Sequence, residues 1–334
     1  MSNVLVFGAT GQLGSAVINQ LLLKGWKVTA VTRARPECLP KGVEAIIADR
    51  LSRTQIIKSL GRTFDAVFEP TAYSDDDATD LLSSCSYFGT AIIVSSCSVY
   101  ADSQGRSLDE AAITGFPEFP SAMTEDTATV PSGPETYSTR KVAMENVFRA
   151  SKLPTTILRP CAIYGPNATH PREWWLIKRA LDGRHKIPIA YNGQSVFHTS
   201  SATSIASLAE ICMQKPKARI LNVADPMPLN IHQIAGALQN ETSLPINLHP
   251  FEGKPRGNIG ASPWSVPRPY VLDSSRAKAL GWDGGEEYAS AVKDMARWLL
   301  SFQNNPDWKS HFHGFSNYAE DPFDYASENR FLSA

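Results

Sequence analysis

The chain has 334 residues, of which 43% are hydrophobic and 19% are charged, a composition typical of a globular protein with a sizeable core. Its formal net charge is -1, so nucleic acid and anionic membranes are not expected partners. No apolar segment reaches the roughly 18 residues of a membrane span, and the five cysteines show no metal-binding spacing. We therefore expect a cytoplasmic protein with reduced thiols and no bound metal.

A glycine-rich segment follows the first expected strand. Val4 to Phe7 is a continuous apolar run, typical of a strand buried on both faces of a parallel sheet. The sequence GATGQLG comes next, and an amphipathic helical pattern follows it. Glycines at these positions permit a tight turn, the approach of a pyrophosphate and close packing of helix on strand. The pattern predicts a dinucleotide site made by Gly8, Thr10, Gly11, Gln12, Leu13 and Gly14.

The end of the second expected strand, Lys27 to Thr32, indicates which nicotinamide cofactor binds. An acidic residue there would hold the ribose 2′-hydroxyl, whereas an arginine suits a 2′-phosphate. The sequence has Arg33 and Arg35 and no acid, which favours NADP(H) and leaves NAD(H) as the alternative. We expect Arg33 to be the main contact and Arg35 the second. The other interpretation is a solvated loop.

Further expected strands at 43–48, 64–68 and 90–94 alternate with helical segments, which predicts a doubly wound parallel α/β sheet. Ligands of such sheets bind at the carboxyl ends of the strands. The three aspartates at 75–77 fit the first turn of a helix better than a metal site. Additional cofactor contacts are expected where the third and fourth strands end, at Asp49, Arg50, Thr71 and Ala72.

A helix is expected from Tyr137 to Ala150. Tyr137 and Lys141 are four residues apart and therefore lie on one face of this helix. An ammonium there would lower the phenol pKa from about 10, so that the phenol could exchange a proton with a carbonyl or hydroxyl near neutral pH. The spacing alone is common by chance. Ser96, which follows the fifth strand, is where a hydroxyl could bind the same substrate oxygen.

Taken together, the motifs resemble the extended short-chain dehydrogenase/reductase superfamily, the group often labelled NAD-dependent epimerase/dehydratase. The resemblance rests on GATGQLG at 8–14, SSCSVY at 95–100, YSTRK at 137–141 and LRPCAIYGP at 158–166, and segments 220–226 and 275–282 extend it. It implies that Ser96 binds the substrate oxygen, Tyr137 gives or takes a proton, and Lys141 holds the nicotinamide ribose and lowers the Tyr137 pKa. It also implies that Pro160, Ala162 and Ile163 lie beside the nicotinamide.

The resemblance also implies two domains. A Rossmann-type domain is expected at 1–165, with 197–225 returning to it, and a smaller α+β substrate lobe at 166–196 and 226–334. Segment 101–136 is expected to be a flap over the substrate or a surface excursion. Segment 251–269, which includes Trp264, is expected to face the substrate. The aromatic segment 304–334 should pack on the lobe or on the second subunit of a homodimer.

Candidate substrate contacts come from both domains. Of the adjacent Trp174 and Trp175, one is expected in the core and the other at a pocket wall. Arg172 would bind an anionic group or lie at the surface, and His198 is more often structural than catalytic. The candidates are Tyr73, Cys97, Ser98, Arg172, Trp175 and His198.

Some positions depart from nucleotide-sugar members of the superfamily. Ala162 stands where many have an asparagine, and Cys97-Ser98 stands where dehydratases have an acidic pair, which argues against a dehydratase. We therefore favour a reductase or dehydrogenase that moves hydride between the cofactor and a small carbonyl or hydroxyl compound. A nucleotide-sugar epimerase with tightly bound NAD is the second interpretation. The third is a non-catalytic redox sensor or an RNA-binding scaffold, since the superfamily includes chloroplast stem-loop-binding relatives.

Overall fold

The computed structural model describes residues 2–33, 36–48 and 53–333. The chain divides into two compact units. Unit 1 comprises Met1–Cys161, Ala202–Ala224 and Leu272–Gly285, and unit 2 comprises Ala162–Ser201, Asp225–Val271 and Glu286–Ala334. The expected division differs mainly at Leu272–Gly285, which belongs to unit 1. Its helix α9 (Ser275–Lys278) follows Ser274, whose Oγ accepts a hydrogen bond of 3.2 Å from the Ala224 amide after the last sheet strand.

Unit 1 is built on a seven-stranded parallel sheet with the strand order β10-β6-β5-β4-β1-β2-β3. The order reverses between β1 and β4, which is the switch point where ligands of doubly wound sheets bind. The five strands predicted up to residue 94 are confirmed, and segment 197–225 returns to the sheet as expected, through β10, which pairs with β6. The strands are β1 (Asn3–Val6), β2 (Lys27–Thr32), β3 (Glu44–Ile47), β4 (Phe64–Glu69), β5 (Phe88–Val94), β6 (Thr155–Pro160) and β10 (Arg219–Val223).

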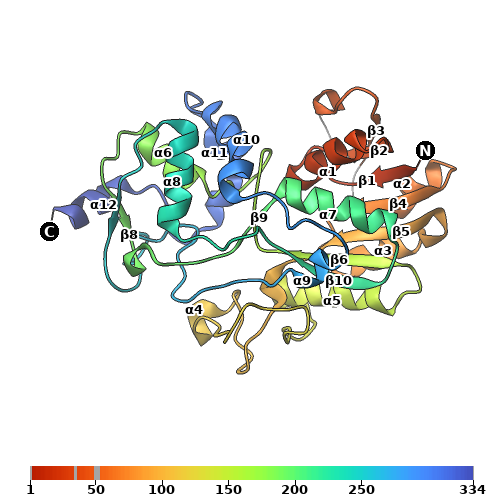
Figure 1. Cartoon of the computed structure of the whole chain (residues 1–334), viewed down its shortest axis with the longest axis horizontal. Helices are drawn as coiled ribbons and strands as arrows, with labels where there is room; N and C mark the ends of the chain where they lie inside the picture. The colour runs from red at the N-terminus through yellow and green to blue at the C-terminus, as the bar shows by residue number, and fades with distance from the viewer. Residues whose placement is uncertain (1, 34–35, 49–52, 334) are drawn as a thin grey trace. The chain divides into compact units, whose positions relative to one another are not determined.

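Helices cover both faces of this sheet. Helix α1 (Gln12–Leu23) packs beside α7 (Ala202–Gln214), and α3 (Asp75–Leu82) packs beside α5 (Tyr137–Ala150) on the opposite face (Figure 1). The three aspartates of α3 lie in its first turn as expected, and Asp77 completes a capping box with Ser74. The short helices of unit 1 are η1 (Pro36–Cys38), α2 (Arg53–Ser59), η3 (Cys85–Tyr87), η4 (Cys97–Val99) and α4 (Ala111–Thr114).

Buried carboxylates hold segment 101–136, one by bonds within the segment and one by a bond to the sheet. Asp102 accepts hydrogen bonds from the Arg106 guanidinium (2.7 Å) and from the Glu118 amide (2.9 Å). Burial opposes ionisation of Asp102, but these bonds outweigh it and lower its pKa to about 2. Glu125 accepts a bond of 2.8 Å from the Asn222 amide of β10. Whether the segment closes over a substrate stays a prediction.

Unit 2 is a smaller α+β unit. Its two short parallel sheets pair β8 (Ile187–Ile189) with β11 (Leu248–Pro250) and β7 (Ala162–Tyr164) with β9 (Thr199–Ser201). No helix among the described residues of the chain is long and apolar enough to cross a membrane. The helical elements of unit 2 are α6 (Trp174–Leu181), η5 (Tyr191–Gly193), α8 (Ile231–Thr242), α10 (Tyr288–Leu300), α11 (Trp308–His311), η6 (His313–Asn317) and α12 (Tyr325–Leu332).

The core of unit 2 corrects two predictions. Trp174 and Trp175 are both fully buried, so Trp175 does not line an open pocket. Trp174 packs on Phe312 with ring centroids 5.3 Å apart, and Trp175 lies under the guanidinium of Arg179 at 3.6 Å. Trp264, which was expected to face a substrate, is also buried in this core. Large aromatic rings gain most from removing their area from water, and the C-terminal segment covers the side of α6 that would otherwise be open.

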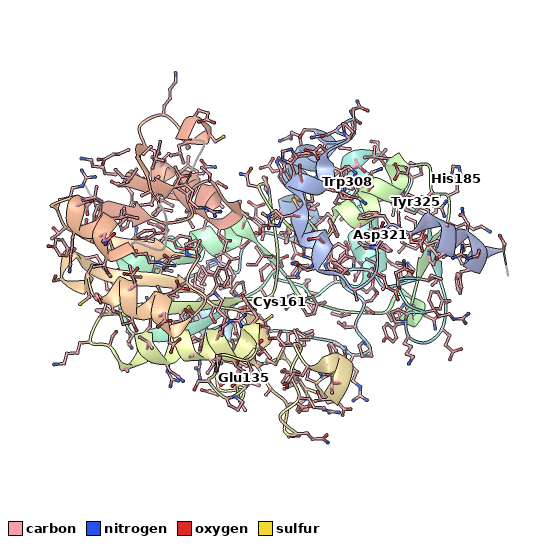
Figure 2. All side chains as sticks on the ribbon, turned by 180° about the vertical axis from the view of Figure 1, so that it is seen from behind. Glu135, Cys161, His185, Trp308, Asp321 and Tyr325 are labelled. Atoms are coloured by element: carbon pink, nitrogen blue, oxygen red, sulfur yellow. The ribbon has the colours of Figure 1, made fainter. Side chains whose placement is uncertain are left out.

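The aromatic C-terminal segment packs on unit 2, as predicted. Figure 2 shows Trp308 and Tyr325 among the side chains of this unit. Arg179 of α6 donates a hydrogen bond of 2.5 Å to Glu328 of α12, and both side chains are buried. This charge pair fixes the end of the chain to α6. Packing on a second subunit stays a prediction.

Candidate active site

The glycine-rich loop after β1 has the geometry that a dinucleotide needs. Gly8 adopts a φ of +61°, and a Cβ there would lie 2.8 Å from the methyl of Thr71. A Cβ on Gly14 would lie 2.2 Å from the carbonyl oxygen of Gly8, so α1 approaches β1 too closely for a side chain. Gly11 is the N-cap of α1, and no side chain caps this helix end among the described residues. The N–H groups of its first turn are therefore suited to a pyrophosphate.

The end of β2 lies against this loop. The amide of Ala9 donates a hydrogen bond of 3.2 Å to the carbonyl of Val31, and the hydroxyls of Thr10 and Thr32 are 3.3 Å apart. Arg33 follows Thr32 directly and is exposed. An adenosine ribose on the glycine loop would therefore meet the start of the segment that carries Arg33. The other expected contacts, Arg35, Asp49 and Arg50, lie outside the described residues.

Ser96 and Tyr137 are brought together at the carboxyl end of β5. Ser96 is the N-cap of η4, and its Oγ accepts a hydrogen bond of 3.1 Å from the Ser98 amide. Ser138 donates a bond of 2.9 Å to the hydroxyl of Ser98, which ties η4 to the first turn of α5. The Ser96 hydroxyl is close enough to the Tyr137 phenol to lower its pKa. Tyr137 keeps 38% of its surface exposed, so a small molecule can reach it.

The electrostatics of Tyr137 differ from the prediction. Its pKa is raised, first by desolvation of the hydroxyl and then by the neighbouring Tyr73, while the Ser96 hydroxyl acts to lower it. The expected lowering by Lys141 is therefore wrong for this structure. The lysine ammonium is 5.7 Å from the centroid of the Tyr137 ring and is directed to backbone carbonyls instead.

Lys141 is a buried cation held between two strand ends. Its Nζ donates to the carbonyl oxygens of Ala72 (2.7 Å) and Val94 (2.9 Å). An ammonium has three donors, so one remains for a ribose hydroxyl. Burial lowers the pKa of Lys141 to about 8, and the carboxylates of Glu69 and Glu145 oppose that shift. The group is therefore mostly charged at neutral pH.

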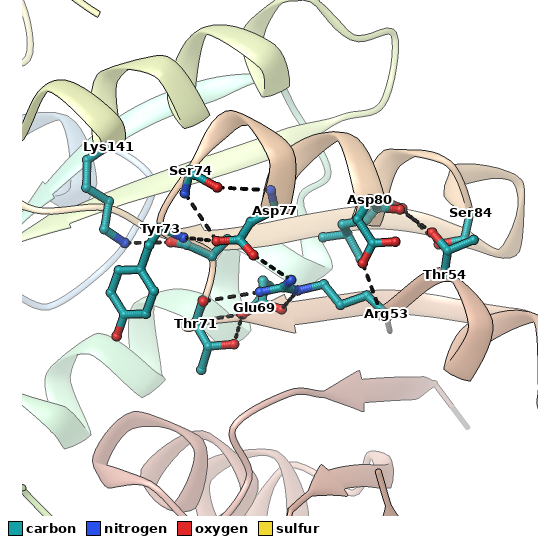
Figure 3. A network of polar contacts seen from close by, with 12 residues as sticks. Arg53, Thr54, Glu69, Thr71, Tyr73, Ser74, Asp77, Asp80, Ser84 and Lys141 are labelled. Atoms are coloured by element: carbon teal, nitrogen blue, oxygen red, sulfur yellow. Dashed lines mark hydrogen bonds and ion pairs between the residues drawn. The ribbon is translucent and has the colours of Figure 1, made fainter. Parts of the chain in front are cut away.

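An ion network fixes the turn after β4. The buried carboxylate of Glu69 accepts from Arg53 Nε and from the Thr71 hydroxyl, both at 2.5 Å (Figure 3). Arg53 also donates to Asp77 (2.9 Å) and to the Thr71 carbonyl (3.1 Å). Thr71 and Ala72 are thereby held at the edge where the predicted cofactor passes. Sequence reasoning missed Arg53 and Glu69; the available signal was an acid directly after the apolar run at 66–68.

The remaining candidates of unit 1 surround Tyr137. Tyr73 is 41% exposed, and its ring centroid is 4.5 Å from Lys141 Nζ and 6.2 Å from the Tyr137 ring. Cys97 and Ser98 are buried within η4. Pro160 ends β6, so it lies at the same edge of the sheet. The structure thus brings Ser96 and Lys141 together with two partly exposed phenols, Tyr73 and Tyr137.

In unit 2 the candidate residues His198 and Arg172 make contacts to backbone carbonyls that stabilise the fold. His198 is buried, and its Nε2 is 2.9 Å from the carbonyl oxygen of Asp225. Arg172 reaches the carbonyl of Ile163 at 3.5 Å. Ala162 and Ile163 form β7, which pairs with β9. These contacts account for the positions of His198 and Arg172, and a role of either in binding substrate stays a prediction.

Comparison with known proteins places this geometry in context. The model of the NAD dependent epimerase/dehydratase family matches residues 4–224. A 3-diazoavenalumate denitrifying reductase from Streptomyces sp. is 25% identical over 322 residues, 92% of this chain and 97% of that protein. A putative GDP-L-fucose synthase 2 from Oryza sativa subsp. japonica is 22% identical over 330 residues, 90% of this chain and 87% of that protein.

Solved structures share the fold at low sequence identity. A UDP-glucose 4-epimerase from Thermotoga maritima, solved with UDP-glucose, superposes with a TM-score of 0.68 at 20% identity and covers 90% of this chain and 99% of its own. A dTDP-glucose 4,6-dehydratase from Bacillus anthracis, solved with NAD, has a TM-score of 0.68 at 15% identity, with 92% and 98% coverage. The Rossmann-type fold is thereby confirmed.

Proposed function

The chain belongs to the NAD-dependent epimerase/dehydratase family, and from this premise we propose that it is an NADP(H)-dependent reductase or dehydrogenase of a small carbonyl or hydroxyl compound. The observation that carries the proposal is Arg33, which is exposed and directly follows β2. The strand itself, Lys27–Thr32, contains no acidic residue. A guanidinium pairs with a phosphate through a planar set of donors, whereas a ribose 2′-hydroxyl is usually held by a carboxylate.

Each residue of the site has a proposed role. The loop from Gly8 to Gly14 holds the pyrophosphate, and Lys141 gives its third donor to the nicotinamide ribose. Pro160, Ala162 and Ile163 lie beside the nicotinamide. A bound nicotinamide cofactor supplies or accepts hydride at carbon.

The hydroxyls of Ser96 and Tyr137 are proposed to bind the substrate oxygen and to transfer its proton. Ser96 donates a hydrogen bond to the substrate oxygen and orients it beside Tyr137. Tyr137 gives that oxygen a proton when a carbonyl is reduced and takes the proton back in the reverse direction. A phenol is protonated at neutral pH and can therefore donate, although the burial that raises the pKa of Tyr137 makes it a weaker acid. The 25% identical relative named as a reductase supports the same reaction class.

A nucleotide-sugar epimerase is the second candidate. The observation that favours it is the set of similar solved structures, of which several are epimerases and two were solved with UDP-glucose. Such an enzyme would keep NAD bound and regenerate it within each turnover. A homodimer is proposed for either activity. A non-catalytic scaffold, including an RNA-binding one, is the third candidate.

The cofactor distinguishes these candidates. The purified protein is denatured and any released nucleotide is identified by mass spectrometry; stripped protein is then titrated with NADPH and NADH. Exchangeable binding with NADPH preferred at least tenfold is expected for the reductase, and would justify a screen of carbonyl substrates. Retained NAD that survives purification would favour the epimerase. Binding of neither nucleotide would leave only the scaffold.

A further inference from the structure

Two cysteines, Cys97 and Cys161, lie just beyond the paired ends of the neighbouring strands β5 and β6. In the pairing of β5 with β6, each residue lies opposite the residue 64 positions later, from Ala91 and Thr155 to Val94 and Leu158. Cys97 and Cys161 are also 64 positions apart, and they follow the ends of the same two strands. Their sulfur atoms are 3.3 Å apart, and both side chains are buried. The sheet therefore brings these thiols together through its backbone pairing.

The geometry suits a covalent bond between the sulfurs. Cys97 lies in η4, directly after the end of β5, and Cys161 directly follows the end of its neighbouring strand β6. A sulfur separation of 3.3 Å must shorten by only about 1.2 Å to reach the disulfide length of about 2.05 Å. The other three cysteines lie elsewhere in unit 1, in η1 (Cys38), η3 (Cys85) and α7 (Cys212).

We propose that Cys97 and Cys161 are a redox-active dithiol that a peroxide closes to a disulfide. One thiolate attacks a peroxide oxygen, the O–O bond breaks, and a sulfenic acid and hydroxide result. The second sulfur attacks the sulfenic sulfur and its S–O bond breaks. With hydrogen peroxide the thiols lose two electrons and two protons, and two waters leave. A small dithiol reverses the bond by exchange and is itself oxidised.

The disulfide acts on the proposed active site through its neighbours in the chain. Cys97 directly follows Ser96, and Cys161 directly follows Pro160. Drawing the two strand ends together displaces Pro160, which is proposed to lie beside the nicotinamide, together with Ser96, so both NADPH binding and turnover should suffer. A misplacement of about 1 Å costs up to roughly a hundredfold in rate. This consequence rests on the proposed function, whereas formation of the disulfide does not.

Thiol counting tests the pair without any substrate. In a Cys38→Ser/Cys85→Ser background, three of the five cysteines remain. Folded protein is treated with hydrogen peroxide, denatured, alkylated and analysed by mass spectrometry. We expect the alkylated thiols to fall from three to one, to return with dithiothreitol, and to leave a linked peptide that joins Cys97 with Cys161. Adding Cys212→Ala should preserve that link, and adding Cys161→Ala should abolish it.

Separately alkylated Cys97 and Cys161 after peroxide treatment, or a link to Cys212, would overturn the proposal. If the background protein does not fold, the same peptide map is made on the wild-type chain. The effect on the site is measured as NADPH affinity before and after oxidation, and we expect a loss of at least tenfold that dithiothreitol reverses. Unchanged affinity in protein that carries the disulfide would overturn the functional consequence. No NADPH binding by the reduced protein would instead refute the proposed function, and the thiol count would still decide the pair.

Discussion

Lys141 donates a hydrogen bond of 2.7 Å to the carbonyl oxygen of Ala72, in the turn that follows β4. A second bond of 2.9 Å reaches Val94 at the end of β5, so one ammonium joins helix α5 to two strand ends. The same lysine is the proposed ribose contact. Its buried position therefore serves cofactor binding and local architecture at once.

We expect Lys141→Met to weaken NADPH binding at least tenfold while changing the free energy of unfolding little. Two buried carbonyls lose their donor, which costs about 1–3 kcal/mol each. Burial lowers the lysine pKa from 10.5 to about 8, which means that burying the charge destabilises the folded protein by about 3 kcal/mol. The variant does not bury this charge, and the gain roughly offsets the lost hydrogen bonds. Fluorescence titration and urea unfolding measure the two effects, with the exposed Lys152→Met as control. Unchanged NADPH affinity would remove Lys141 from the cofactor site.

The two phenols beside Lys141 should differ in their importance. The phenol of Tyr137 is influenced by the nearby Ser96 hydroxyl, whereas Tyr73 contacts the site through its ring. We expect Tyr137→Phe to lower turnover by about 10² or more, as for a lost general acid, with cofactor affinity retained. Tyr73→Phe should stay within a few fold of wild type. Steady-state kinetics on the carbonyl substrate found by screening makes the comparison, and the opposite ranking would transfer the proton role to Tyr73.

The fold was predictable because its signals are local. Apolar runs mark the buried parallel strands, and glycine marks positions such as Gly14, where the backbone leaves no space for a Cβ. Thr136 forms a capping box with Thr139, which begins α5 at Tyr137 as predicted. Burial in unit 2 was less predictable. Trp175 and Trp264 are covered by segments distant in sequence, and local periodicity does not show such cover.

The site was predictable as a set of residues but not in its electrostatics. The spacing of Tyr137 and Lys141 placed them on one helix face, yet it did not show that the ammonium points to carbonyls after β4 and β5. Desolvation depends on the surroundings of the whole side chain, so the direction of the Tyr137 pKa shift required coordinates. The Arg53–Glu69 pair joins residues on different elements, which a single sequence does not connect.

Arg33→Ala tests the cofactor preference. We expect NADPH affinity to fall roughly ten- to hundredfold, the loss of a charge-assisted bond, and NADH affinity to stay within a few fold. Isothermal titration with both nucleotides measures this, and Arg149→Ala removes an exposed arginine of α5 as a matched control. Equal losses for both nucleotides, or none, would place the 2′-phosphate contact elsewhere, with Arg35 as the next residue to test.

Unit 2 contains a buried acid that should make its stability depend on pH. Glu173 precedes α6, is almost fully buried and accepts a hydrogen bond of 3.2 Å from the Tyr288 hydroxyl. Desolvation raises its pKa to about 7, against the opposing effects of hydrogen bonds and of Arg172, and the charge of Asp225 adds to the rise. Asp225 is itself raised to about 6 by burial. In the folded protein both carboxyls therefore keep their proton up to a higher pH than they would in the unfolded chain.

A folded-state pKa of about 7 against an unfolded value near 4.5 gives a stabilising contribution that is complete below about pH 4.5 and lost as the pH rises through about 7. We therefore expect wild type to lose up to about 3 kcal/mol relative to Glu173→Gln between pH 5 and pH 8, because the amide has the same shape and no charge. Thermal unfolding of both proteins across this range measures the difference. Glu252→Gln, an exposed position of the same unit, should track wild type at every pH. A difference between wild type and Glu173→Gln that is constant with pH would show that Glu173 ionises normally in the folded chain.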